Sequence, residues 1–296
     1  MTARELQNLI EVFRNFEQRE NPTVEQIRGD LARLEAALPV PDDAEVEVIE
    51  AGGVPAEWVA APGTDSASVL LYLHGGGYAF CGPASHRLLS YNLSAAADVR
   101  CLLLDYRLAP EHPYPAAVED AVVAYRWLLA QGVNPKHITV AGDSAGGGLT
   151  VALMLRLREL GIDLPAAGAC LSPWTDLAIT GNSIETLAEV DPLVRRDGLE
   201  RCVGWYLGDG DPTDPLASPL YGELAGLPPL LIQVGSDEVL LDDALRLAER
   251  ARAAGVAVDY RCWEEMFHVW HLYAPMLSEG REAIADVGNF LKRHLP

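Results

Sequence analysis

Short apolar runs alternate with amphipathic helical segments along most of this chain, and this alternation constrains the fold more than any other feature. The apolar runs occupy residues 68–74, 99–106, 138–142, 166–172, 229–235 and 256–263. Segments with apolar residues at helical spacing occupy 115–132, 144–161, 240–255 and 280–295. Continuous apolar strands separated by such helices indicate an α/β fold with a parallel sheet covered on both faces. Ahead of them, residues 44–50 alternate as a half-buried strand does, and 57–62 are the expected hairpin partner.

Two regions break this alternation. Residues 1–39 carry apolar residues at helical spacing, interrupted at Asn21-Pro22, and residues of about 177–212 are rich in apolar side chains between two expected strands. An apolar insertion needs a surface to cover. We therefore expect both regions to form a cap over the carboxyl edge of the sheet, within one domain spanning 1–296. With 49% hydrophobic residues, the chain can build one large core.

Charge and cysteine content exclude several classes of function. The net charge of −21 argues against nucleic acid, which needs a basic surface, and disfavours anionic membranes and polyanionic substrates. A neutral small molecule is the easiest substrate. The five cysteines form no C-x-x-C pair, so no zinc or redox motif is indicated. No run approaches the roughly 18 apolar residues of a membrane span, and residues 1–20 are charged throughout, so we expect a cytoplasmic protein.

The stretch ITVAGDSAGGGLT (138–150) contains a candidate nucleophile, Ser144, in the pattern G-x-S-x-G between a strand and a helix. This pattern is typical of the nucleophile elbow of α/β-hydrolases. Its sharp turn forces the serine into a positive φ, which is possible only if Gly142 and Gly146 lack side chains. An ordinary glycine-rich turn is the alternative. A phosphate-binding loop is disfavoured because the Walker lysine is missing.

A second glycine-rich stretch, His74-Gly75-Gly76-Gly77-Tyr78, follows the strand at 68–73. Three consecutive glycines permit a backbone path that turns N–H groups towards one point, as a tetrahedral oxyanion requires. We expect Gly75 and Gly76 to be the donors, joined by Ala145 at the start of the next helix, where the helix dipole is favourable. The alternative is a flexible glycine hinge.

A serine hydroxyl needs an adjacent base, and the expected chain order is serine, acid, histidine. The histidines after Ser144 are His268, His271 and His294. The first two share the loop that follows the last strand, whereas His294 lies in the final helical turn. For the acid, Asp237 comes first after the strand at 229–235, and Glu238 is the alternative.

Five motifs in order along the chain resemble the bacterial hormone-sensitive lipase family of α/β-hydrolases. They are HGGGY at 74–78, DYRLAPEHPYPAA at 105–117, GDSAGG at 142–147, SPWTDL at 172–177 and ASPL at 217–220. The resemblance implies an eight-stranded, mostly parallel sheet and a serine esterase. By motif match it implies Ser144 as nucleophile, Asp237 as acid and His268 as base, with Gly75, Gly76 and Ala145 as the oxyanion hole. The acid segment GSDEVLLDD departs from the usual Asp-Pro-Leu-x-Asp-Glu, and His271 is interpreted as structural.

The expected function is therefore hydrolysis of short-to-medium-chain neutral esters by a serine carboxylesterase through an acyl-enzyme, without metal or organic cofactor. Trp174, Trp205 and Tyr206 are the candidate pocket residues. One alternative is a lactone hydrolase, such as a monoterpene ε-lactone hydrolase, which uses the same triad. Another is a non-catalytic small-molecule binding protein on this scaffold, as in the plant gibberellin receptors, which lack the catalytic histidine. Members of the family often dimerise through one sheet edge, and residues 256–263 could serve as that edge in a homodimer.

Overall fold

The computed structural model describes residues 10–11, 22–35, 39–64 and 67–296. Eight strands form one sheet in the order β1-β2-β4-β3-β5-β6-β7-β8. β1 pairs with β2 and β2 with β4 in antiparallel orientation, and all other pairs are parallel. The strands are β1 Glu45–Ala51, β2 Val54–Ala60, β3 Val69–Leu73, β4 Arg100–Leu104, β5 Ile138–Asp143, β6 Ala167–Leu171, β7 Leu230–Gly235 and β8 Val258–Trp263. The predicted hairpin and the mostly parallel eight-stranded sheet are confirmed.

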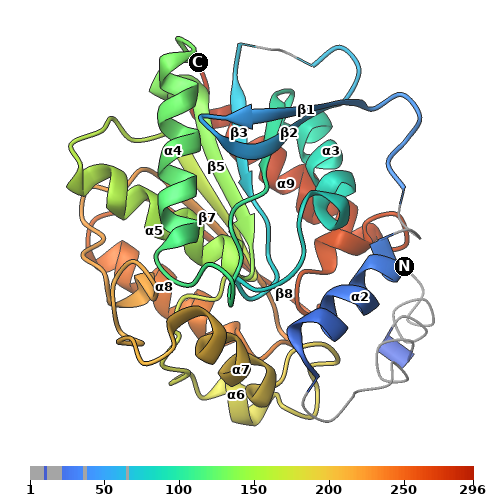
Figure 1. Cartoon of the computed structure of the whole chain (residues 1–296), viewed down its shortest axis with the longest axis vertical. Helices are drawn as coiled ribbons and strands as arrows, with labels where there is room; N and C mark the ends of the chain where they lie inside the picture. Colours follow the sequence, from blue (N-terminus) through green and yellow to red (C-terminus); the bar gives the residue numbers. More distant parts are fainter. Residues whose placement is uncertain (1–9, 12–21, 36–38, 65–66) are drawn as a thin grey trace.

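Helices cover both faces of the sheet (Figure 1). They are α3 Pro83–Ala97, α4 Ala116–Ala130, α5 Ala145–Glu159, α8 Leu241–Ala253 and α9 Ser278–His294, with 3₁₀ turns at Pro135–His137, Pro219–Tyr221 and Trp270–Tyr273. Side chains of α4, α5 and α8 share one buried cluster, and side chains of α3 and α9 share a second one. Strand β3 serves both: Leu71 and Leu73 face the first cluster, Leu70 and Tyr72 the second. The two cores thus follow from the two-residue period of a strand.

Three further helices, α2 Val24–Glu35, α6 Ser183–Thr186 and α7 Arg196–Leu207, gather at one end of the molecule, in the lower part of Figure 1. Helix α2 begins with a reciprocal cap, because the Gln26 amide donates to Thr23 Oγ1 and the Thr23 amide to Gln26 Oε1. Most of the expected first helix lies outside the described residues. Helix α2 lies in the described part of region 1–39, and helices α6 and α7 lie in region 177–212.

Candidate active site

Ser144 lies at a sharp turn between β5 and α5. Its backbone has φ 51° and ψ −121°, a conformation that L-residues rarely adopt. Such a residue stores roughly 1–3 kcal/mol of strain, which the surrounding structure must hold in place. The Ser144 amide donates to the Leu171 carbonyl at 2.9 Å, and the Trp174 amide donates to the Ser144 carbonyl at 2.9 Å. The predicted elbow is therefore confirmed.

The glycines around Ser144 are required by close backbone approach. A side chain on Gly146 would overlap the Leu73 carbonyl, and one on Gly142 would overlap the Gly146 carbonyl. Gly148 packs on the Trp174 carbonyl with no room for a Cβ atom. Helix propensity is thus given up, at about 1 kcal/mol per glycine, so that β3, the elbow and the segment after β6 can meet.

The loop after β3 is fixed by the residue that precedes the nucleophile, Asp143. Its buried carboxylate accepts hydrogen bonds from the Tyr72 hydroxyl at 2.7 Å and the Gly75 amide at 3.0 Å, and faces His86 Nε2 at 3.2 Å. Burial disfavours the charged form of Asp143, but the facing His86 and these hydrogen bonds outweigh it, and its pKa lies below the usual value. A carboxylate in the core thereby anchors the glycine loop to the elbow.

This anchoring corrects one predicted oxyanion donor. The Gly75 amide is engaged by Asp143, so it does not face a substrate. Gly76 and Gly77 have φ of 106° and 56°, and neither amide donates a hydrogen bond to any of the described residues. The Ala145 amide, at the first position of α5, has no such partner either. The available set is therefore Gly76, Gly77 and Ala145.

The acid that contacts the histidine is Glu238, and the prediction of Asp237 is wrong on this point. Glu238 Oε2 lies 2.7 Å from His268 Nδ1, and its Oε1 accepts from the Gly235 amide at 2.7 Å and the Ser172 hydroxyl at 2.8 Å. Asp237 instead accepts from the Ser236 hydroxyl, while its amide donates to the Met266 carbonyl. Ser236 and Asp237 form the tip of the turn after β7, and Glu238 is where the turn returns to the sheet edge.

A sequence signal for Glu238 was present. The family pattern Asp-Pro-Leu-x-Asp-Glu aligns without a gap on Glu238-Val239-Leu240-Leu241-Asp242-Asp243, which places Glu238 at the first acid. Asp237, the first carboxylate after the strand, lies one position before the start of this pattern.

His268 is 8% exposed, and both burial and nearby carboxylates act on its pKa. Burial lowers the pKa of its imidazole, but the hydrogen bond and charge of Glu238, with Asp191 and Asp143 further off, outweigh this and raise the pKa above its usual value. Because a carboxylate only accepts, Nδ1 carries the proton and Nε2 is left as an acceptor. Neither Nε2 nor Ser144 Oγ has a hydrogen-bond partner among the described residues.

The segment Ser172–Trp174 joins the nucleophile to the histidine loop. Trp174 holds the Ser144 carbonyl, as described above, and Ser172 Oγ accepts from the Val269 amide at 3.1 Å while donating to Glu238. Ser172 and Val269 both have positive φ, 45° and 49°. These hydrogen bonds join the elbow, the acid and the histidine loop to one segment. All of them follow the carboxyl ends of neighbouring parallel strands, where α/β sheets bind ligands.

Of the other singled-out residues, His271, Trp174 and Tyr206 are buried, and Trp205 is half-buried. His271 is fully buried, its Nε2 lies 2.8 Å from Gln233 Oε1, and burial lowers the pKa of its imidazole to about 3, in agreement with a structural interpretation. Tyr206 of α7 stacks on Tyr78, and Trp174 lies beside the same ring. Trp205 is half-buried against the larger core cluster. Their role in a substrate pocket stays a prediction.

Three comparisons place the chain among known proteins. A family model described as alpha/beta hydrolase fold matches residues 70–272. An acetyl-hydrolase from Streptomyces hygroscopicus is 53% identical over 246 residues, which cover 83% of this chain and 82% of the relative. The crystal structure of an esterase from the bacterial hormone-sensitive lipase family is 48% identical, with a TM-score of 0.97 and full coverage of both chains. A crystal structure of EstE5 soaked with p-nitrophenyl butyrate is 43% identical, with a TM-score of 0.95 and 99% of each chain covered.

The fold and the elbow define an α/β-hydrolase. Within that class, the chain belongs to the bacterial hormone-sensitive lipase family and is a carboxylic ester hydrolase. In the part of the chain that is described, no helix is both long and apolar enough to cross a membrane.

Proposed function

We propose that the protein hydrolyses short-to-medium-chain neutral esters through an acyl-enzyme on Ser144. His268 Nε2 takes the hydroxyl proton as Ser144 Oγ attacks the ester carbonyl, and then gives it to the departing alcohol. Water repeats the cycle on the acyl-enzyme. Glu238 holds the Nδ1 proton and stabilises the imidazolium. The observation that carries this proposal is that the strained serine of the elbow and a buried Glu238–His268 pair are both hydrogen-bonded to the segment that follows β6.

The oxyanion of each tetrahedral intermediate would be bound by the amides of Gly76, Gly77 and Ala145. Among the described residues, none of these three amides has another hydrogen-bond acceptor. This supports the assignment, because donors already satisfied elsewhere do not stabilise developing charge. Asp143 acts on this hole indirectly, by fixing the Gly75 amide that precedes it.

The described helices of regions 1–39 and 177–212 are proposed to cap this site. Arg28 of α2 donates to the Ala79 carbonyl just after the glycine loop, and Cys202 of α7 packs against Gly77. Buried aromatic rings from α7 and the glycine loop would leave room for a short acyl chain, and a relative named acetyl-hydrolase and one soaked with a butyrate ester support that size. Cytoplasmic location and a homodimer stay predictions.

A fluorophosphonate probe tests the nucleophile. Wild-type protein should be labelled at Ser144, whereas Ser144→Ala should be neither labelled nor active, and His268→Ala should be labelled at least roughly 10²-fold more slowly. An active Ser144→Ala protein would overturn the proposal.

A panel of p-nitrophenyl esters from acetate to palmitate, with ε-lactones beside open-chain esters, tests the substrate. We expect kcat/KM to peak between acetate and about octanoate. A maximum at palmitate would contradict the proposed chain length, and a preference for lactones would identify the lactone hydrolase instead.

A further inference from the structure

Asp191 is a buried carboxylate in the insertion that the proposed mechanism does not use. It is 6% exposed and lies between α6 and α7. Its Oδ1 accepts from the Leu193 and Val194 amides at 2.8 and 2.9 Å, which closes a local turn. Its Oδ2 accepts from the Val239 amide at 2.9 Å. One carboxylate oxygen therefore accepts hydrogen bonds within the insertion. The other accepts a hydrogen bond from outside it, from the backbone of the residue directly after Glu238.

The same Val239 is held from its other side by the insertion. Ser183 at the start of α6 donates its hydroxyl to the Val239 carbonyl at 2.5 Å. Both polar groups of the Val239 backbone are thus bound by side chains from the insertion. Because Glu238 is adjacent in the chain, this clamp restricts the position of the side chain that contacts His268.

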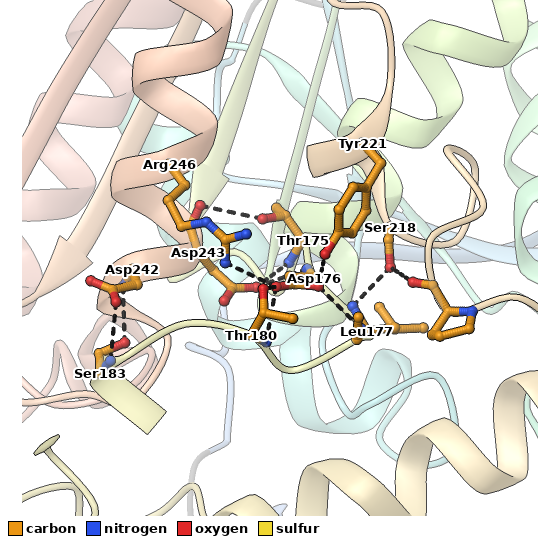
Figure 2. Close-up of polar contacts among 12 residues, drawn as sticks. Thr175, Asp176, Leu177, Thr180, Ser183, Ser218, Tyr221, Asp242, Asp243 and Arg246 are labelled. Atoms are coloured by element: carbon orange, nitrogen blue, oxygen red, sulfur yellow. Dashed lines mark hydrogen bonds and ion pairs between the residues drawn. The ribbon is translucent and has the colours of Figure 1, made fainter. Parts of the chain in front are cut away.

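Ser183 of the clamp is also hydrogen-bonded to helix α8 (Figure 2). Ser183 Oγ accepts from the Asp242 amide at 3.0 Å, and the Ser183 amide donates to Asp242 Oδ2 at 3.1 Å. Nearby, Asp243 accepts from the Thr175 and Asp176 amides at 2.7 and 2.9 Å, where the chain enters the insertion. Asp176 in turn pairs with Arg246 of α8 at 2.9 Å. The insertion is therefore bonded to the acid loop and its helix at several points.

Asp191 also adds charge at the histidine. Glu238 contacts His268 directly, and the charges of Asp191 in the insertion and Asp143 at the end of β5 also raise the pKa of His268. His271, in the 3₁₀ turn Trp270–Tyr273, interacts electrostatically with His268 as well. Burial raises the pKa of Asp191 and His268 opposes this, so the two groups interact in both directions.

We propose that Asp191 is a positioning residue for the Glu238–His268 pair, which clamps the acid loop through Val239 and adds a second negative charge to the field at His268. This rests on the proposed function, because it assigns Asp191 to the reaction that Ser144 and His268 carry out. In this arrangement the insertion helps to set the basicity of the histidine as well as covering the site.

Two substitutions separate position from charge. Asp191→Asn removes the charge and weakens the clamp, so kcat should fall roughly tenfold to hundredfold, and the acid limb of the kcat/KM profile should move to lower pH because the histidine loses a stabilising anion. Ser183→Ala loosens the Val239 carbonyl without changing charge, so kcat should fall with the acid limb in place. Asp197→Asn, an exposed acid of α7 paired with Arg201, is the control and should change neither.

Circular dichroism and thermal melts establish that each variant is folded. If Asp191→Asn does not fold, Asp191→Ser retains an acceptor for the Leu193 and Val194 amides and takes its place. An Asp191 variant that loses activity with an unmoved acid limb, or keeps wild-type kcat, overturns the proposal. Wild-type activity that disappears in Ser144→Ala shows independently that the proposed function stands.

Discussion

At the scale of single residues, the two neighbouring acids after β7 differ in what they contact. Glu238 is fully buried and contacts His268, whereas Asp237 is half-buried and faces Ser236. We predict that Glu238→Gln lowers kcat by roughly 10³- to 10⁴-fold, because an amide no longer fixes the imidazole tautomer or its cation. Asp237→Asn, the matched control one position away, should stay within about twofold of wild type. Initial rates on p-nitrophenyl butyrate measure both.

The reverse ranking would return Asp237 to the role of acid. A similar loss in both variants would instead indicate damage to the turn, which thermal melts would reveal as a shared loss of stability.

The pH dependence of hydrolysis follows from the carboxylates around His268. The base must be neutral to accept a proton, and its pKa in the folded protein lies above the ordinary value. Activity should therefore be lost as the pH falls through a value above about 6.5, so the acid limb lies at higher pH than for an unperturbed histidine. The kcat/KM profile of the wild type measures this limb. A profile flat to pH 5 would contradict a histidine base.

Which site residues the sequence could predict depends on how locally each is determined. The G-x-S-x-G pattern between a strand and a helix was enough to single out Ser144 and Ala145, and chain order with the motif match was enough to single out His268. The prediction of Gly75 as an oxyanion donor was wrong, because its amide donates to Asp143. Asp143 is adjacent in sequence to the nucleophile, but its contact with the glycine loop is a tertiary one. Asp191 and Ser172 act through backbone groups of distant segments, for which no spacing pattern exists.

At the scale of elements, the Arg28 side chain bonds helix α2 to the backbone beside the glycine loop. Arg28 donates to the Ala79 and Ala109 carbonyls at 2.8 and 2.9 Å and makes a two-pronged ion pair with Glu111. The ion pair is largely exposed and contributes little, but the carbonyl bonds fix the backbone after the glycine loop. We predict that Arg28→Ala lowers kcat/KM about tenfold, the cost of charged hydrogen bonds of about 1.5 kcal/mol.

Glu111→Gln is the matched control for that prediction. It removes the charge partner and leaves both carbonyl bonds, so kcat/KM should change by less than about twofold. Equal losses in the two variants would show that the ion pair, rather than the carbonyl contacts, holds α2.

The strands and helices were predictable wherever the spacing of apolar residues and the length of the segment indicated the same kind of element. All six apolar runs became strands β3 to β8, each within two residues of the expected limits. Helix α3 was missed because its buried face includes polar residues, His86, Ser90 and Ser94, which give no apolar stripe. These small or hydrogen-bonded side chains are buried by packing against β2, β4 and α9, which sequence spacing does not reveal.

At the scale of the whole molecule, the net charge of −21 acts on any charged substrate before it reaches Ser144. The field repels anions, and Asp191, Glu238 and Asp143 add negative charge at the site itself. We predict that kcat/KM for a neutral butyrate ester is unchanged within about twofold between 10 mM and 500 mM NaCl. For an ester with a free carboxylate, such as a monosuccinate, it should rise several-fold over that range, because salt shortens the Debye length from about 30 Å to a few ångströms.

The comparison of the two esters isolates electrostatics from general salt effects, since both use the same triad and leaving group. Reversal of the trend, with the anionic ester favoured at low salt, would place a cationic binding group in the site. It would contradict the predicted preference for neutral esters. That preference is expected because the surface is acidic and because carboxylates surround the catalytic histidine. An enzyme that selects neutral esters in this way needs no dedicated residue to exclude anions, because the negative field that raises the pKa of the histidine also repels anionic substrates.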